Sequence, residues 1–366
     1  MKIKAAVVHE PNTPYVFEEI ELAPPKADEI LVKVAASGIC HTDHAVVTTE
    51  LNFAPFPIVL GHEGSGTVVE VGNIVKEFKP GDRIGMSFSY CGQCQTCASG
   101  RPYGCDKILD LNFKGRSYDG TTRLSKDGKS ISCFFNQSSF ATYCVTNQNN
   151  AVLLPDGIDF ALAAPIGCGI QTGAGAVLNY LNPSPLSSIV VSGCGSVGLS
   201  GVMAAKLCGC ERIIGVDVVE SRLELASVLG ATHVINAKHQ DPVSAVLEIT
   251  KGRGAEYALD ATGIGACVRT SLNCTANFGV CAVVGNSQEI TFNIAVELNP
   301  LQRTLVGILE GHCSPKKFIP QLIELYKKGL FPIDRLVKTY DFDELNTASH
   351  DALTGASVKS VVVMKD

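Results

Sequence analysis

The chain has 366 residues, 46% of them hydrophobic and 18% charged, a composition typical of a compact protein with about two domains. Its net charge is −6 and it contains no basic run, which argues against a nucleic-acid-binding surface. No apolar stretch reaches the roughly 20 residues that span a membrane, and residues 1–10 lack the apolar segment of a secretory signal. We therefore expect a cytoplasmic protein that binds neither membranes nor nucleic acid.

The first half of the chain is expected to be β-rich. Short Val- and Ile-rich runs separated by proline turns predict strands at residues 3–9, 30–35, 67–72 and 134–145. The chain also has 15 cysteines and eight histidines. In a reducing compartment so many cysteines indicate metal ligands or buried thiols, and not a disulfide framework.

Two thiolates and one imidazole, far apart in the chain, form the first candidate metal site: Cys40, His62 and Cys168. This donor set suits a zinc ion that keeps its fourth position open for water or substrate. Asp43 and Glu63 adjoin two of these residues and are candidate second-layer or alternate carboxylates. Thr42 offers a hydroxyl beside the metal. Taken one residue at a time, a buried structural role is the better interpretation, and the set gains weight only from the motifs that follow in the chain.

Four cysteines within fifteen positions form a second candidate site, Cys91, Cys94, Cys97 and Cys105 in the pattern C-x2-C-x2-C-x7-C. Four thiolates at this spacing can close a tetrahedral structural zinc site on a loop. An iron–sulfur cluster is the competing interpretation, and the spacing favours zinc. An unliganded, oxidisable loop is the remaining alternative.

A nucleotide-binding motif follows a predicted buried strand at residues 188–192. The run Gly193-Cys194-Gly195-Ser196-Val197-Gly198 fits G-x-G-x-x-G and precedes a predicted helix at 199–208. Its glycines permit a tight turn that brings backbone amides to a pyrophosphate. A second strand at 212–216 ends in Asp217, where a carboxylate can bind the adenosine ribose. The alternatives are a ligand-free turn and, for Asp217, a cap on the next helix.

The alternation of strands and helices continues beyond this motif. The pattern predicts helices at 221–229, 242–250 and 320–328, and strands at 233–235, 257–260, 280–284, 305–309 and 359–364. Such alternation is typical of a doubly wound parallel sheet.

The chain resembles the zinc-dependent alcohol dehydrogenases of the medium-chain dehydrogenase/reductase family over essentially its whole length. The resemblance depends on Gly61-His62-Glu63-Gly64, the four-cysteine segment, residues 193–198 and Asp217. The stretches 134–140, 167–176 and Glu310-Gly311 with Ser314-Pro315 are similar to the aryl-alcohol (benzyl alcohol) branch, with geraniol-type dehydrogenases nearby.

The resemblance implies a Rossmann domain at 170–309 inserted into a β-rich GroES-like catalytic domain, at 1–169 and 310–366, with the active site in the cleft. It implies two zinc ions, a catalytic one on Cys40, His62 and Cys168 and a structural one on Cys91, Cys94, Cys97 and Cys105. Thr42 would pass the alcohol proton towards the ribose of NAD. The implied cofactor contacts are His41, Thr172, Gly193, Gly195, Ser196, Val197, Gly198, Asp217, Arg222, Val284 and Lys359. The implied substrate pocket contains Phe88, Phe134, Phe135 and Leu309.

One position departs from the family pattern. Many relatives end their proton relay with a histidine two residues after the equivalent of Asp43, where this chain has Ala45, and His44 lies one residue early. The terminal base of the relay is thus left open. The segment at 106–135 resembles the extra loop of dimeric relatives, which favours a homodimer, with a tetramer as the alternative.

The expected activity is reversible, NAD-linked oxidation of an aromatic or allylic primary alcohol to its aldehyde. A glutathione-dependent formaldehyde dehydrogenase or a polyol dehydrogenase is one alternative. A non-catalytic relative that keeps only the nucleotide fold is another, and it predicts an eroded zinc ligand set.

Overall fold

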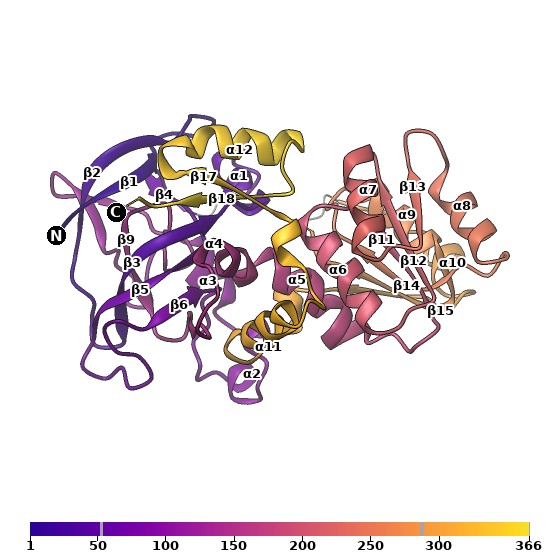
Figure 1. Ribbon diagram of the computed structural model, residues 1–366, viewed down its shortest axis with the longest axis horizontal. Helices are drawn as coiled ribbons and strands as arrows, with labels where there is room; N and C mark the ends of the chain where they lie inside the picture. Colours follow the sequence, from indigo (N-terminus) through magenta and orange to yellow (C-terminus); the bar gives the residue numbers. More distant parts are fainter. Residues whose placement is uncertain (52–53, 286–288, 366) are drawn as a thin grey trace. The chain divides into compact units, whose positions relative to one another are not determined.

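The computed structural model describes residues 1–51, 54–285 and 289–365. The chain divides into two units (Figure 1). Unit 1 contains Met1–Cys168, Ser314–Lys327 and Ile333–Asp366, and unit 2 contains Gly169–Cys313 and Lys328–Pro332. Unit 1 is thus assembled from both ends of the chain, with most of unit 2 inserted between them.

Unit 1 contains two sheets. The first has the strand order β4-β1-β2-β7-β8, and the second has the order β10-β6-β5-β3-β18-β17, with β9 also paired to β3. The strands are β1 Lys2–Val8, β2 Val16–Leu22, β3 Glu29–Gly38, β4 Ile58–Val59, β5 Glu63–Val71, β6 Arg83–Met86, β7 Leu124–Lys126, β8 Lys129–Ile131, β9 Tyr143–Asn147, β10 Ala151–Leu153, β17 Val337–Asp341 and β18 Lys359–Val363. The helices are α1 His41–Val47, α2 Gln95–Ala98, η1 Pro102–Gly104, α3 Ile108–Phe113, α4 Phe160–Ala163, η2 Ala164–Gly167, α11 Pro315–Lys327, η5 Ile333–Arg335, η6 Phe342–Glu344 and α12 Leu345–Thr354.

Unit 2 is a doubly wound fold around a six-stranded parallel sheet of order β13-β12-β11-β14-β15-β16. The strands are β11 Ser188–Ser192, β12 Arg212–Asp217, β13 His233–Asn236, β14 Ala255–Asp260, β15 Thr275–Val283 and β16 Thr304–Gly307. The helices are α5 Gly169–Gly175, η3 Ala176–Leu181, α6 Ser196–Leu207, α7 Glu220–Leu229, α8 Pro242–Ile249, α9 Gly265–Asn273, α10 Ile294–Glu297 and η4 Glu310–His312. The strand order reverses between β11 and β14, the place where such sheets bind nucleotides.

The cores of the two units reflect the two strand patterns. All five residues of β11 are buried, as expected for a parallel strand covered by helices on both faces. In unit 1 the paired strands β1 and β2 bury residues at alternate positions against one side, among them Ile3, Ala5, Ile20 and Leu22. The predicted parallel sheet and the predicted β-rich part are therefore confirmed.

Three predictions differ from the structure. Residues 134–139 form a turn and not a strand, because Phe135, Asn136 and Ser138 have positive φ angles near 50°, and the strand begins only at Tyr143. The helix expected at 320–328 begins five residues earlier, with Pro320 inside it. The second predicted domain boundary was 309/310, whereas residues 310–313 pack within unit 2, where Cys313 and Glu310 hydrogen-bond to Gln171.

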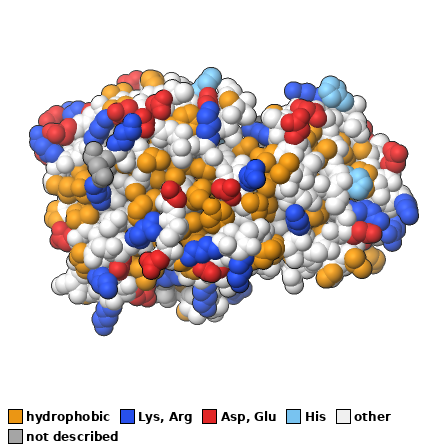
Figure 2. Space-filling view, viewed as in Figure 1, with side chains coloured by type: hydrophobic (Ala, Val, Ile, Leu, Met, Phe, Trp, Pro, Cys, Tyr) orange, Lys and Arg blue, Asp and Glu red, His pale blue; other side chains and the backbone are white. Residues whose placement is uncertain are grey.

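No single helix of the described chain is long and apolar enough to cross a membrane, although the bent pair Phe160–Gly167 and Gly169–Leu181 passes that test by length and composition. On the face shown in Figure 2, acidic and basic side chains are interspersed.

Candidate metal and nucleotide sites

The first metal-ligand set lies within unit 1 and begins at the N-terminus of α1. Cys40 is the residue before this helix and has an extended backbone. Its amide donates to the carboxylate of Asp43, three residues later, at 3.1 Å. The Thr42 hydroxyl lies 3.5 Å from the Cys40 thiol. The start of the helix thus holds the thiol and the neighbouring hydroxyl together.

Asp43 also orients the imidazole of His62. The carboxylate is buried and lies 3.0 Å from His62 Nδ1, and the same oxygen accepts from the Gly61 amide at 3.0 Å. A carboxylate at Nδ1 keeps the proton on that nitrogen and leaves the lone pair on Nε2. Among the described residues, the buried His62 Nε2 has no hydrogen-bond partner.

Cys168 approaches these groups from the end of η2. The Ser87 hydroxyl donates to the Gly167 carbonyl at 2.6 Å, which fixes the turn before the thiol. Gly167 passes so close to β6 that an added Cβ would lie 2.1 Å from the Met86 carbonyl oxygen. Ligand atoms of Cys40, His62, Glu63 and Cys168 all lie within 4.8 Å of one another. The unsatisfied imidazole nitrogen and the two thiols fit a zinc ion.

Glu63 forms a buried ion pair beside this set. The Lys359 ammonium on β18 donates to both Glu63 carboxylate oxygens at 2.8 Å and to the Ile39 carbonyl at 3.1 Å. Lys359 is 2% exposed. Its ammonium is thus buried within unit 1 and compensates Glu63, and the contact of Lys359 with a cofactor pyrophosphate stays a prediction.

The charges of this cluster shift one another's protonation. A hydrogen bond with Cys168, and then the neighbouring His62, holds the pKa of Cys40 well below its usual value. Burial alone would lower the pKa of Lys359, but the Glu63 carboxylate and Cys40 raise it. Burial raises the pKa of Glu63 in spite of the nearby ammonium. The site therefore favours a thiolate at Cys40.

Two aromatic rings pack against the His62 imidazole. The ring centroids of Phe135 and Phe134 lie 4.5 Å and 5.4 Å from that of His62, and both residues are buried. Phe88 is also buried, and its ring lies 5.9 Å from that of Tyr90. Leu309 belongs to unit 2 and is 46% exposed.

Gln137 is a residue of this site that the sequence analysis missed. Its side-chain amide donates to the carbonyls of His62 at 2.8 Å and Ser87 at 3.1 Å, and its oxygen accepts from the Gly64 amide at 3.1 Å. It therefore ties the His62 backbone to Ser87, the residue that follows β6. The available signal was four consecutive polar residues, 136–139, in an otherwise apolar run.

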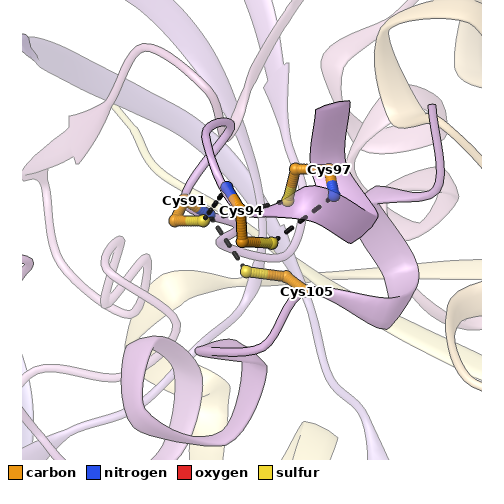
Figure 3. Close-up of side chains that lie close together, drawn as sticks. All are labelled: Cys91, Cys94, Cys97 and Cys105. Atoms are coloured by element: carbon orange, nitrogen blue, oxygen red, sulfur yellow. Dashed lines mark hydrogen bonds between the residues drawn. The ribbon is translucent and has the colours of Figure 1, made fainter. Parts of the chain in front are cut away.

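The four-cysteine segment forms a second compact cluster in unit 1 (Figure 3). Ligand atoms of Cys91, Cys94, Cys97 and Cys105 lie within 4.8 Å of one another, and all four are free thiols. Backbone amides point at the sulfurs: Cys91 N at Cys105 Sγ and Cys94 N at Cys91 Sγ, both at 3.3 Å, and Cys97 N at Cys94 Sγ at 3.4 Å. Backbone hydrogen bonds from Asp106 and Cys97 lower the pKa of Cys94 to about 6. This arrangement fits a four-thiolate structural zinc.

The glycine-rich turn lies in unit 2 between β11 and α6. Gly193 has a φ of +86°, and Gly195 is the residue before α6. An added Cβ on Gly198 would lie 1.8 Å from the Gly193 carbonyl oxygen, so only glycine allows this turn to close. Ser196 and Val197 open the helix, where free backbone amides can bind phosphate.

Asp217, at the end of β12, is 8% exposed. Its carboxylate accepts from the amides of Cys194 at 2.7 Å, Val218 at 2.7 Å and Val219 at 2.9 Å. It therefore contacts the glycine-rich turn and also the segment that leads into α7. Arg222, in the first turn of α7, has a buried Nε without a hydrogen-bond partner among the described residues.

The other predicted cofactor residues are distributed over both units. Thr172, on α5, is 8% exposed, and an added Cβ on its neighbour Gly173 would lie 1.8 Å from the Val197 carbonyl oxygen, so α5 and α6 pack closely. The Val284 amide donates to the Asp260 carbonyl at 3.0 Å, at the end of the parallel sheet. His41 lies in unit 1, exposed at the start of α1, 5.8 Å between ring centroids from His44.

Comparison with known proteins matches both parts of the chain. Residues 26–156 match the alcohol dehydrogenase GroES-like domain, and residues 196–328 match the zinc-binding dehydrogenase family. Geraniol dehydrogenase from Castellaniella defragrans is 39% identical over 98% of this chain and 97% of its own length.

Two solved structures are similar over the full length of both chains. The crystal structure of benzyl alcohol dehydrogenase from Acinetobacter calcoaceticus has a TM-score of 0.95 at 43% identity. That of an alcohol dehydrogenase zinc-binding domain protein from Burkholderia ambifaria has a TM-score of 0.96 at 41% identity.

Proposed function

Because the chain belongs to the zinc-dependent alcohol dehydrogenases of the medium-chain dehydrogenase/reductase family, we propose that it oxidises an aromatic or allylic primary alcohol to the aldehyde. The reaction is reversible and uses NAD. The observation that carries this proposal is the meeting of Cys40, Cys168 and His62 beside the Phe134 and Phe135 rings, where His62 Nε2 has no hydrogen-bond partner in the described part of the chain.

The proposal assigns a role to each group of the site. Cys40, His62 and Cys168 hold a zinc ion, which when bound acts as a Lewis acid that makes an alcohol hydroxyl more acidic. Thr42 accepts the hydroxyl proton of the alcohol and passes its own proton onward. Asp43 keeps His62 in the ligating tautomer, and Lys359 balances the charge of Glu63. NAD supplies a nicotinamide ring that accepts a hydride.

The substrate class is tested by a panel of alcohols followed through NADH absorbance. Two relatives are named for geraniol and for benzyl alcohol, and aromatic side chains favour a flat, unsaturated substrate through edge and face contacts. We expect benzyl, cinnamyl and geranyl alcohols to exceed ethanol in kcat/KM by at least tenfold, because ethanol leaves most of such a pocket unfilled. Equal values for ethanol, better turnover of sorbitol, or a requirement for glutathione would refute the proposal.

The preference for NAD is assigned to Asp217. A carboxylate here accepts hydrogen bonds from the ribose hydroxyls, whereas the 2′-phosphate of NADP would place like charges together. We expect the kcat/KM of wild type to be about a hundredfold higher with NAD than with NADP. Asp217→Ala should raise KM for NAD and reduce this ratio. Kinetics with both cofactors decide this, since a carboxylate that only orders the β12–α7 segment would leave the ratio unchanged.

We also propose two zinc ions per chain and a homodimer. The second zinc is held by Cys91, Cys94, Cys97 and Cys105. Elemental analysis of purified protein should find two zinc ions and no iron, and light scattering after size exclusion gives the oligomeric state. Iron, or full activity with fewer than two zinc ions, would overturn the metal assignment.

A further inference from the structure

The turn that carries the two phenylalanines beside His62 has an unusual backbone. Phe135, Asn136 and Ser138 have φ angles of 51°, 50° and 50°, in the left-handed region that non-glycine residues seldom occupy. Such conformations persist only where surrounding contacts over-determine them. The contacts that hold this turn therefore determine where the Phe135 ring lies.

One set of contacts comes from the strands around His62. The Ser138 hydroxyl donates to the Val59 carbonyl at 2.8 Å and accepts from the Phe134 amide at 2.9 Å. Ser139 and Ser37 share a hydrogen bond of 2.6 Å. These bonds hold Phe134, Ser138 and Ser139, and they do not reach the backbone of Phe135 itself.

Phe135 is held instead by a buried cluster of amides around Ser89. The Phe135 amide donates to the Asn112 carbonyl at 3.1 Å, and the Phe135 carbonyl accepts from Asn150 Nδ2 at 3.0 Å and from Ser89 Oγ at 3.3 Å. The Asn136 side chain donates to Ser89 Oγ at 3.2 Å and to the Leu111 carbonyl at 3.1 Å. All of these residues are at most 8% exposed.

The same cluster is anchored on the four-cysteine segment. Asn112, on α3, clamps the Ser89 backbone with two side-chain bonds, accepting at 2.8 Å and donating at 2.9 Å. The first turn of α3 continues directly from the cysteine cluster, since the Ile108 amide donates to the Cys105 carbonyl at 2.9 Å. Leu111 packs in one hydrophobic cluster with Cys91 and Cys105. A continuous chain of packed and hydrogen-bonded groups thus joins the cysteine cluster to the Phe135 ring.

We propose that the four-cysteine segment positions the substrate site, with Asn112 and Asn136 as positioning residues that hold the Phe135 ring against His62. The order of this segment then sets the preference for ring-bearing over small aliphatic alcohols. The expected change in substrate preference rests on the proposed function. The expected change in the order of the turn rests only on the hydrogen bonds described above.

The first test compares three variants. Asn136→Gly removes the amide while keeping a residue that tolerates positive φ, and Asn112→Ala removes the clamp on Ser89 at a helical position. Asn147→Ala is the matched control, because it is also a buried asparagine of unit 1, but its side chain donates to Asp28 and accepts from the Asn149 amide. We expect the first two variants to lower the benzyl-to-ethanol ratio of kcat/KM about tenfold, mainly through KM for benzyl alcohol. An unchanged ratio, or an equal effect of the control, would overturn the proposal.

A double-mutant cycle with Phe135→Leu separates positioning from general destabilisation. If Asn136 acts through the Phe135 ring, Asn136→Gly should have little further effect on the ratio once that ring is gone. Additive effects of the two substitutions would show that Asn136 acts by another route.

Hydrogen exchange supplies a readout that needs no activity. In Asn112→Ala, amides at residues 133–140 should exchange at least tenfold faster than in wild type, with unit 2 unchanged. Unchanged exchange there would refute the positioning role. If wild type fails to oxidise benzyl alcohol while this exchange still rises, the proposed substrate class is wrong and the positioning role stands.

Discussion

Asp43 is the side chain on which the three-ligand site depends most directly, because one buried carboxylate bonds the Cys40 amide, the Gly61 amide and His62 Nδ1. Asp43→Asn keeps the shape of the side chain but removes the negative charge that holds the proton on His62 Nδ1. We expect the affinity for the catalytic zinc to fall 10- to 100-fold. Chelator titration with metal analysis should show one zinc ion released early and the other retained.

The matched control for that substitution is Asp159→Asn. Asp159 caps α4 by accepting from the Ala161 amide at 2.7 Å, and asparagine caps helices equally well. The control should release both metals as wild type does. Identical release curves for Asp43→Asn and the control would contradict the role given to Asp43.

Residue types and spacing were sufficient to predict that the four cysteines gather in one cluster, whereas the gathering of Cys40, His62 and Cys168 was predicted from the resemblance to a family. Residue types and spacing were insufficient for Lys359 and Gln137. Each of these bonds a residue far away in the chain, Lys359 with Glu63 across 296 positions and Gln137 with His62 across 75. Only the strand pairing of unit 1 brings such partners together.

At the scale of elements, the parallel sheet was predictable and the turn at 134–139 was not. The central strands β11, β12 and β14 are short, mostly buried runs that end at an acid or just before a glycine. The turn contains two apolar residues followed by four polar ones, a pattern that an interrupted strand would also show. Its left-handed backbone depends on distant partners such as Ser89 and Val59, which no local pattern contains.

The four-cysteine segment is expected to stabilise unit 1 only when its metal is bound. It contains the short α2 and η1 and few apolar side chains of its own. Cys94→Ser removes one thiolate, and because structural zinc contributes folding free energy, the variant should keep one zinc ion and lose several kcal/mol of stability. Thermal unfolding with metal analysis checks this. Cys208→Ser, at the end of α6 in unit 2, should leave both quantities unchanged.

A carboxylate at the start of β14 couples two strands of the parallel sheet in a pH-dependent manner. Glu256 accepts from the Ser188 amide at 2.8 Å and from its hydroxyl. Burial alone would raise the pKa of Glu256, but these hydrogen bonds outweigh it and lower the pKa below the usual 4.5. A lowered pKa stabilises the folded state above the unfolded pKa, and this stabilisation is lost as the pH falls through the folded value.

Glu256→Gln should therefore be less stable than wild type at pH 7, by at most about 1 kcal/mol because the side chain is exposed. The difference should shrink as the pH is lowered below about 4.5. Urea unfolding at pH 7 and pH 4 measures it. A difference that grows towards low pH would have the wrong sign.

At the scale of the whole molecule, the two units differ in which parts of the chain form their sheets. The sheet of unit 2 is formed entirely from residues 188–307. Unit 1 needs both termini, because β18 pairs antiparallel with β3 and parallel with β17. The insertion of one unit into the other follows from the resemblance to a family, whereas strand propensity alone would not place residues 359–363 beside residues 36–38.

This difference predicts unequal behaviour of fragments. Residues 169–313 contain a complete doubly wound sheet with its own core and should unfold cooperatively when expressed alone. Residues 1–168 lack β18, which leaves an edge of β3 unpaired. They also lack Lys359, so the buried Glu63 carboxylate loses its compensating charge, a change that costs about 3–5 kcal/mol.

We therefore expect residues 1–168 to aggregate or remain unfolded, and co-expression with residues 314–366 to restore a soluble, folded unit. The discriminating variant is Lys359→Met in the second fragment, which keeps the strand and removes the charge. If strand pairing alone matters, this variant rescues as well as wild type. If the ion pair matters, the Lys359→Met fragment should fail to make residues 1–168 soluble and folded. Solubility should return when residues 1–168 also carry Glu63→Gln, which removes the uncompensated carboxylate. Circular dichroism and gel filtration of the co-expressed fragments give the answer, and cooperative folding of residues 1–168 alone would contradict the argument.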